Sequence, residues 1–323
     1  MVSEASKIQP KNMMKFGKAL IQNGLYYRKE VIKAAYALSQ ELWNAACQEG
    51  DIDEAIEFVI KLDYENLELD LTNQQKFERY INIASAYNQN KMFINAEPYI
   101  RKCQKMKSSI KDDKLLVIFS YCNSQFLDFN KRFLYAAFAY YEICKNGAEI
   151  VEQLGLELNE VLRQALVATV LSEEGDKKRF LISQLVKDER IKKLEHYDIL
   201  EKFHFNKFTT EQDVQTFAKD LEPHQNIETT EGMTSLEQIM MEHNIIVISK
   251  LYRDISINSI AKRLNIKRQQ VEKYLQNMNS EGKLSVIIDH RADNVVFKKT
   301  EEIMEDGRNT LEKFCKMLEG ITG

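Results

Sequence analysis

Residues 235–299 read SLEQIMMEHNIIVISKLYRDISINSIAKRLNIKRQQVEKYLQNMNSEGKLSVIIDHRADNVVFKK, and in this stretch three helical patterns precede two β-type segments. Apolar residues recur at helical spacing in the first part, and runs of Val, Ile and Phe flank a polar loop in the second. The expected elements are helices at residues 235–252, 259–264 and 267–279 and strands at residues 284–289 and 294–298. This order predicts a winged helix.

A winged helix often binds nucleic acid by placing its third helix in the major groove. Here that helix carries Lys267, Arg268 and Lys273, but acidic residues stand among them. The whole chain has a formal net charge of -4 and a pI near 5.9. Because phosphate binding needs a concentrated basic face, nucleic acid is an unlikely partner. That alternative predicts an affinity that depends on salt and falls when Lys267, Arg268 and Arg291 are neutralised.

Several short sequence motifs in this region resemble, in order and spacing, those of the PCI-domain family, and within it the subunit 4 group of the COP9 signalosome. The similarity covers roughly residues 131–299. The words that carry it are Glu242-His243-Asn244, Ser249-Lys250-Leu251-Tyr252, Ala261, Leu264, Glu272, Met278, Glu281-Gly282, Ile288-Asp289 and Phe297, and upstream Lys187-Asp188-Glu189-Arg190, Ile199-Leu200-Glu201-Lys202 and Pro223-His224-Gln225. Two positions depart from the family pattern. Asp293 replaces a Gly in the wing turn, and Asn279 replaces an apolar residue in the third helix.

Composition favours a mostly α fold. The chain has 323 residues, of which only 11 are Gly and 3 are Pro, so it lacks the special backbone positions that sandwiches, barrels and Gly-rich nucleotide folds need. The aromatic and Ala spacing around Tyr80, Ala84 and Ala96 predicts a right-handed, tetratricopeptide-like helical repeat (TPR-like) solenoid. Weaker copies are expected at residues 44–58 and 133–144.

The predicted organisation has three parts. Residues 1–127 form an N-terminal helical-repeat arm, and residues 128–299 form a PCI domain with a helical part at 128–234 and the winged helix at 235–299. Residues 300–323 form a C-terminal bundle helix.

Neither a membrane span nor a secretory signal is expected, because no run of about eighteen apolar residues occurs and residues 1–18 lack an apolar core. The 5 cysteines are odd in number and widely spaced, which indicates reduced thiols in an intracellular protein. We therefore expect no disulfide framework.

The sequence offers no residues for catalysis, so no enzyme, cofactor or metal is predicted. The 5 histidines show no metal-ligand spacing, and there is no Gly-rich phosphate loop or nucleophile elbow. His243, on an apolar helix, is interpreted as a core residue with a hydrogen-bond partner. The basic run 177–179 is interpreted as a solvated face.

Two features predict protein–protein contacts. Apolar residues recur every three or four positions along residues 303–321, giving a narrow stripe that suits a bundle with helices of other chains, although it could instead fold back on the winged helix. Residues 294–298 are expected to be an edge strand that another winged helix extends, unless Lys298 and Lys299 protect it. The candidate interface residues are Leu284, Val286, Ile288, Val295, Phe297, Ile303, Leu311, Phe314, Leu318 and Ile321.

The resemblance implies a scaffold without catalytic residues of its own. The COP9 signalosome removes Nedd8 from cullin-RING ubiquitin ligases, and its isopeptidase activity belongs to a different subunit with a zinc-binding His-x-His motif. The implied partners are the other PCI subunits, the MPN-type subunits and, as substrate of the complex, a cullin-RING ligase held by the helical arm. The implied location is cytoplasm and nucleus. The paralogous PCI subunit of the proteasome lid and a translation-initiation scaffold of the same build remain alternatives.

Overall fold

The computed structural model describes residues 71–228, 233–289 and 291–298, with scattered positions before them (12, 14–16, 19, 38–39, 41–43, 45–46 and 56–57). It divides into two compact units, Met1–Ala165 and Leu166–Gly323. The predicted boundaries at residues 127 and 234 differ from this division and stay a prediction. The repeat expected at residues 44–58 lies almost wholly outside the described residues.

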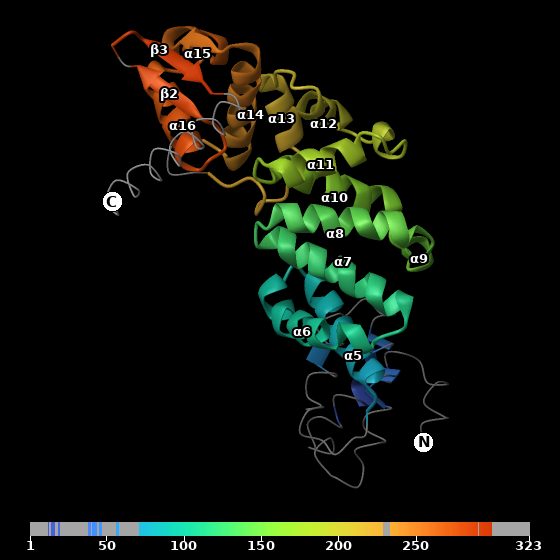
Figure 1. Cartoon of the computed structure of the whole chain (residues 1–323). Helices are drawn as coiled ribbons and strands as arrows, with labels where there is room; N and C mark the ends of the chain where they lie inside the picture. The colour runs from blue at the N-terminus through green and yellow to red at the C-terminus, as the bar shows by residue number, and fades with distance from the viewer. Residues whose placement is uncertain are drawn as a thin grey trace, which may run out of the picture. The chain divides into compact units, whose positions relative to one another are not determined.

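The first unit is built from helical hairpins (Figure 1). Its described helices are α5 (Asn73–Gln89), α6 (Phe93–Met106), η3 (Lys107–Ser109), α7 (Asp113–Phe129), α8 (Phe133–Asn146), α9 (Ala148–Gln153) and most of α10 (Leu158–Leu171). Ala96 on α6 and Ala136 on α8 are fully buried, because small side chains let the paired helices approach closely. The prediction of helical repeats is confirmed here.

The turns of the two hairpins repeat one another. The first turn has the sequence Asn-Lys-Met-Phe and the second Asn-Lys-Arg-Phe. In both turns the lysine adopts the left-handed conformation, with φ of 57° at Lys91 and 59° at Lys131. The amide of Lys91 donates to Asn88 at 2.9 Å, and that of Lys131 donates to Asp128 at 2.9 Å. These bonds satisfy carbonyls at the helix end and reverse the chain. The repeated Asn-Lys-x-Phe word is therefore a turn signal.

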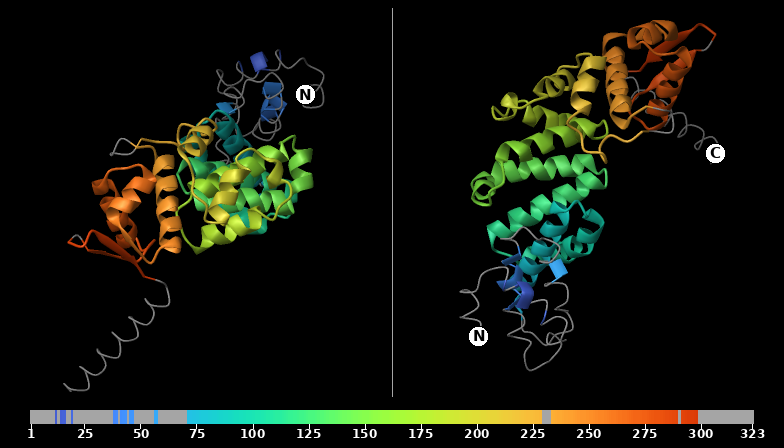
Figure 2. Two further views of the ribbon diagram at one scale, coloured as in Figure 1. Left: turned by 90° about the horizontal axis from the view of Figure 1, so that it is seen from above. Right: turned by 180° about the vertical axis from the view of Figure 1, so that it is seen from behind.

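The second unit begins with the end of α10 and continues with α11 (Asp176–Leu185), η4 (Ile191–Lys193), α12 (Tyr197–His204) and α13 (Glu211–Ala218). The winged helix follows, with α14 (Ser235–Leu251), β1 (Asp254–Ser256), α15 (Ile257–Leu264), α16 (Arg268–Ser280), β2 (Val286–Asp289) and β3 (Asn294–Phe297). Figures 1 and 2 show the strands alongside these three helices. The mostly α fold with a winged helix is confirmed.

Local chemistry fixes the ends of these elements. Thr234 forms a capping box with Glu237 at the start of α14, and Ser256 caps α15. In the wing turn Asp293 adopts a φ of 52°, so the aspartate does take the left-handed conformation that a Gly usually supplies. The carboxylate of Asp289 accepts the amides of Arg291 and Ala292 at 2.9 and 3.0 Å, which closes the turn.

The sheet corrects one prediction. Its strand order is β1-β3-β2 with antiparallel pairing throughout, so β3 is the central strand and not an edge. The sequence pattern missed β1, which has only three residues and pairs Ile255 with Val295. Because β1 occupies one side of β3, only β1 and β2 present open edges in the described part of the chain.

No helix in the described ranges is long and apolar enough to cross a membrane.

Candidate protein–protein interface

β2 is one of the two strands of the winged helix with an open edge, where unpaired backbone groups can accept a further strand. Lys298 donates its amide to the carbonyl of Ser285 at 3.0 Å, which makes this a hydrogen-bonded pair of the β2–β3 ladder. Hydrogen-bonded and non-hydrogen-bonded pairs alternate along such a ladder. The backbone groups of Val286 and Ile288 therefore point away from β3, toward the open edge.

One of these edge groups already has a partner. The amide of Val286 donates to Oδ1 of Asn279 at 3.1 Å. The Asn at this position, which departs from the family pattern, thus satisfies an edge donor from α16. The backbone of Ile288 is the next group along the edge and is the point where a further strand would pair.

Five of the predicted interface residues lie in the described part of the chain, and they are in the winged-helix core or pack against it. Val286, Val295 and Phe297 are 8%, 0% and 3% exposed and belong to the winged-helix core, against which Leu284 and Ile288 also pack. Their side chains hold the sheet on the helices, so they offer a partner little surface. The remaining predicted residues, Ile303, Leu311, Phe314, Leu318 and Ile321, lie outside the described residues.

The residue that the pattern missed is Ile287, whose side chain is 51% exposed on β2. Strand residues alternate between faces, and both neighbours of Ile287 point to the core. An apolar residue between two inward-facing ones was the available signal. It places an exposed apolar side chain on the strand that has the open edge.

Helix α14 supports this sheet and also packs on the helices before it. Residues 242–248 are buried without interruption. Successive helical residues point about 100° apart, so seven buried in a row cover every face of the helix. Ile245 and Ile248 join the winged-helix core, while His243 and Asn244 meet the loop between α12 and α13.

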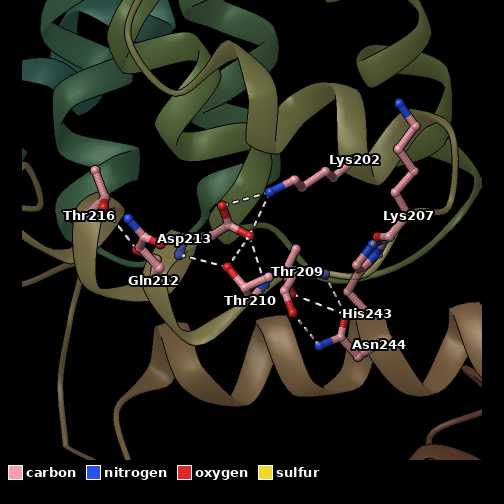
Figure 3. Close-up of polar contacts among 9 residues, drawn as sticks. All are labelled: Lys202, Lys207, Thr209, Thr210, Gln212, Asp213, Thr216, His243 and Asn244. Carbon is pink, nitrogen blue, oxygen red and sulfur yellow. Dashed lines mark hydrogen bonds and ion pairs between the residues drawn. The ribbon is translucent and has the colours of Figure 1, made fainter. Parts of the chain in front are cut away.

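Figure 3 shows the polar contacts on that side of α14. Oδ1 of Asn244 accepts from the amide of Thr209 at 2.9 Å, and Nδ2 of Asn244 donates to the carbonyl of the same residue at 3.0 Å. The carboxylate of Asp213 accepts from Nζ of Lys202 at 2.7 Å and closes the capping box of α13 with Thr210. The loop is thus held at both ends, which fixes the winged helix on α12 and α13.

His243 is a core residue, as predicted. Its ring stacks on Phe203 with centroids 3.9 Å apart, and Nε2 lies 3.0 Å from the carbonyl oxygen of Lys207. A carbonyl only accepts, so Nε2 carries the proton and donates. Burial lowers the pKa of His243 from 6.5 to about 4, which keeps the ring neutral.

Lys178 corrects the interpretation of the basic run as a solvated face. Its side chain is 1% exposed, and Nζ donates to the carbonyls of Val170 and Ser172 at 3.0 and 2.8 Å, with the carboxylate of Glu174 at 3.6 Å. Burial lowers the pKa of Lys178. The ammonium satisfies carbonyls at the C-terminal end of α10, where a positive charge also meets the negative end of the helix dipole.

Arg268, one of the cations of α16, forms ion pairs within the chain. Nε of Arg268 lies 3.0 Å from Glu272 on the same helix, and its guanidinium also lies 3.0 Å from Asp293 in the wing. These contacts tie the wing to α16 and partly neutralise the charge of Arg268. The acidic residues that weigh against nucleic-acid binding in the sequence therefore also contact Arg268 in the structure.

One group among the described residues has donor atoms close enough for a metal ion: Glu195, His196 and Asp220, within 4.8 Å of one another. The sequence did not reveal it because His196 and Asp220 lie 24 positions apart. Nε2 of His196 and the carboxylate of Asp220 are 2.6 Å apart, and the imidazole edge meets the ring of Phe217. This contact is sufficient to explain the arrangement as a hydrogen bond between the start of α12 and the residues after α13.

Comparison with known proteins agrees with this architecture. Residues 212–299, which include α13 and the winged helix, match the family model described as the PCI domain. Over 246 residues, 76% of the chain, it is 28% identical to COP9 signalosome complex subunit 4 of Drosophila melanogaster, covering 59% of that protein. It is also 28% identical to the subunits 4 of Arabidopsis thaliana and Neurospora crassa, over 76% and 87% of the chain and 63% and 64% of those proteins. The chain thus spans about three-fifths of the length of these curated relatives.

Proposed function

We propose that this protein is a non-catalytic scaffold subunit of a COP9 signalosome, acting in the deneddylation of cullin-RING ubiquitin ligases by holding other subunits in place. The observation that carries the proposal is the similarity to subunit 4 proteins across both compact units, together with an open strand edge on the PCI domain. An added strand pairs its backbone with such an edge and so needs no catalytic side chain.

In this proposal assembly uses two parts of the chain. A winged helix of a neighbouring subunit pairs with β2 beyond Val286 and covers Ile287, and the apolar stripe of residues 303–321 joins a bundle with helices from other subunits. The N-terminal helical arm, residues 1–127, would help to hold the cullin-RING ligase. Cytoplasm and nucleus are the compartments where this substrate would be met.

The paralogous subunit of the proteasome lid is the nearest alternative, since it would share the same PCI architecture. A winged-helix nucleic-acid-binding protein belongs to a different class. The contacts of Arg268 with Glu272 and Asp293 weigh against it, because two cation–carboxylate contacts would have to be exchanged for phosphate contacts.

The test is purification of the tagged chain from its native cell under mild conditions, with half of the sample treated with nuclease, followed by mass spectrometry. We expect several PCI proteins, a zinc isopeptidase and cullins in both halves. Recovery with proteasome ATPases would assign the chain to the lid. Partners that disappear after nuclease treatment would overturn the scaffold proposal.

A further inference from the structure

The last turn of α16 takes up most of the hydrogen-bond donors on the open edge of β2. The amide of Leu284, just before the strand, donates to the carbonyl of Met278 at 3.2 Å, and the amide of Val286 donates to Oδ1 of Asn279 at 3.1 Å. Within β2 only Val286 and Ile288 point their backbone groups toward this edge. Among the described residues, the amide of Ile288 is therefore the one edge donor of β2 that is left open.

Asn279 is held where it can reach β2. Met278, its neighbour on α16, is fully buried in the winged-helix core. The carbonyl of Met278 accepts the amides of Lys283 and Leu284 at 2.9 and 3.2 Å, which brings the chain back past the end of α16 toward β2. Asn279 itself is exposed. Its side chain thus serves as an acceptor at the edge of the sheet and adds nothing to the packing of the core.

An exposed strand edge can pair with the same edge of a second copy of the chain. Two copies related by a two-fold axis would pair antiparallel, and only one register of β2 forms more than one hydrogen-bonded residue pair. This register places Val286 of each copy opposite Ile288 of the other, and Ile287 opposite Ile287. Because the side chain of Ile287 is 51% exposed, the same register would also bury apolar surface. The edge is therefore open to self-association unless another contact prevents it.

The hydrogen bond from Val286 to Asn279 acts against this register in both copies at once. Each copy would have to give up its bond to Asn279, or leave a carbonyl of the other copy without a donor. A strand from a different chain meets the blocked amide only once, and it can form a complete pair at Ile288. The arrangement thus weakens self-pairing more than it weakens pairing with another protein.

We propose that Asn279 is a specificity-determining residue of the β2 edge: by holding the amide of Val286, it prevents β2 from pairing with β2 of a second copy. The acceptor belongs to the same chain, 7 residues from the donor, so it is present at a high effective concentration. The edge of the free chain stays available to a strand that pairs at Ile288, as in the proposed scaffold function. The inference goes beyond that function, because it concerns the chain on its own.

The test is the self-association of the purified full chain, measured by sedimentation equilibrium, with hydrogen exchange of peptides covering residues 284–289 to locate the contact. Asn279→Ala removes the acceptor and should raise the self-association constant at least about tenfold, because the amide of Val286 becomes available in both copies. Exchange in residues 284–289 of this variant should slow as the protein concentration rises. In the unaltered chain it should not depend on concentration.

Two further variants serve as controls. Asn277→Ala removes another exposed Asn of α16 but keeps Asn279, and should leave both measurements unchanged. Combining Asn279→Ala with Ile288→Pro removes the remaining edge donor and should return the self-association constant to that of the unaltered chain. Peptides from α15 report whether each variant is folded. If Asn279→Ala disturbs them, Asn279→Leu, which also lacks an acceptor and suits a helix, takes its place.

The proposal is overturned if removal of the Asn279 acceptor leaves the self-association constant unchanged, or if residues 284–289 of the unaltered chain are already protected at high concentration. It is equally overturned if the association gained by Asn279→Ala survives Ile288→Pro, since the contact would then lie elsewhere. These measurements use no partner proteins, so their failure would leave the scaffold function to its own test.

Discussion

At the scale of single residues, the neutral, buried His243 couples the stability of the winged helix to pH. The folded protein holds its pKa near 4, against an ordinary value of 6.5. Above pH 6.5 the ring is mostly neutral in both the folded and the unfolded state, so its titration does not change the free energy of unfolding. As pH falls from 6.5 toward 4 the unfolded state binds a proton that the folded state does not, so stability falls. Between about pH 7.5 and pH 5 the expected loss is roughly 2 kcal/mol, measured by urea unfolding at both values.

The variant His243→Gln should show a smaller loss between the two pH values than the unaltered chain, even if it is less stable at both. Its amide keeps a donor for the carbonyl of Lys207 but does not titrate. The control His204→Gln, on α12, should keep the full loss. The same pH dependence in the unaltered chain and in His243→Gln would contradict the role given to His243.

The sequence predicted a buried histidine, but its partners Phe203 and Lys207 lie 40 and 36 positions away and could not be predicted from helical spacing.

At the scale of elements, each turn between paired helices holds a lysine in a left-handed backbone conformation that glycine would adopt at a lower free-energy cost. Lys131 has a φ of 59°, a conformation in which a side chain costs about 1 kcal/mol relative to Gly. The lysine is exposed, so its removal loses little packing. Lys131→Gly should therefore stabilise the first unit by about 0.5–1 kcal/mol, as a higher midpoint in thermal or urea unfolding. The matched control, Glu142→Gly on the exposed side of α8, should destabilise it by about 1 kcal/mol. Loss of stability in both variants would refute the explanation.

Elements were predictable to the extent that they depend on local pattern. The three helices of the winged helix agree with the predicted ranges to within two residues at each end, because capping residues and apolar spacing lie close in sequence. Strand order was not predictable in the same way. β1 has three residues and no alternation long enough to detect, and its pairing with β3 turned a predicted edge into the centre of the sheet. Lys178 escaped prediction for a similar reason: its partners are carbonyl groups of the backbone, which every residue has.

At the scale of the whole molecule, the fold separates residues that build the PCI domain from residues that would join it to others. Phe297 is 3% exposed in the winged-helix core, whereas Ile287 is 51% exposed beside the open edge of β2. Phe297→Asp should cost roughly 3–5 kcal/mol in the isolated chain, because it buries a carboxylate and removes an aromatic core residue. Ile287→Asp should change that stability by less than about 1 kcal/mol, since its side chain is already in water.

The two substitutions should differ again in the assembled state. With the tagged chain expressed in its native cell, Ile287→Asp is expected to reduce recovery of the other PCI proteins about tenfold, because a charge beside β2 must be buried when a partner strand pairs there. Ile287→Val keeps the apolar surface and should leave recovery unchanged. If Ile287→Asp assembles as well as the valine variant, strand addition at β2 is not the mode of assembly. Phe297→Asp cannot make this distinction, since it would lose partners by unfolding the domain that holds the edge.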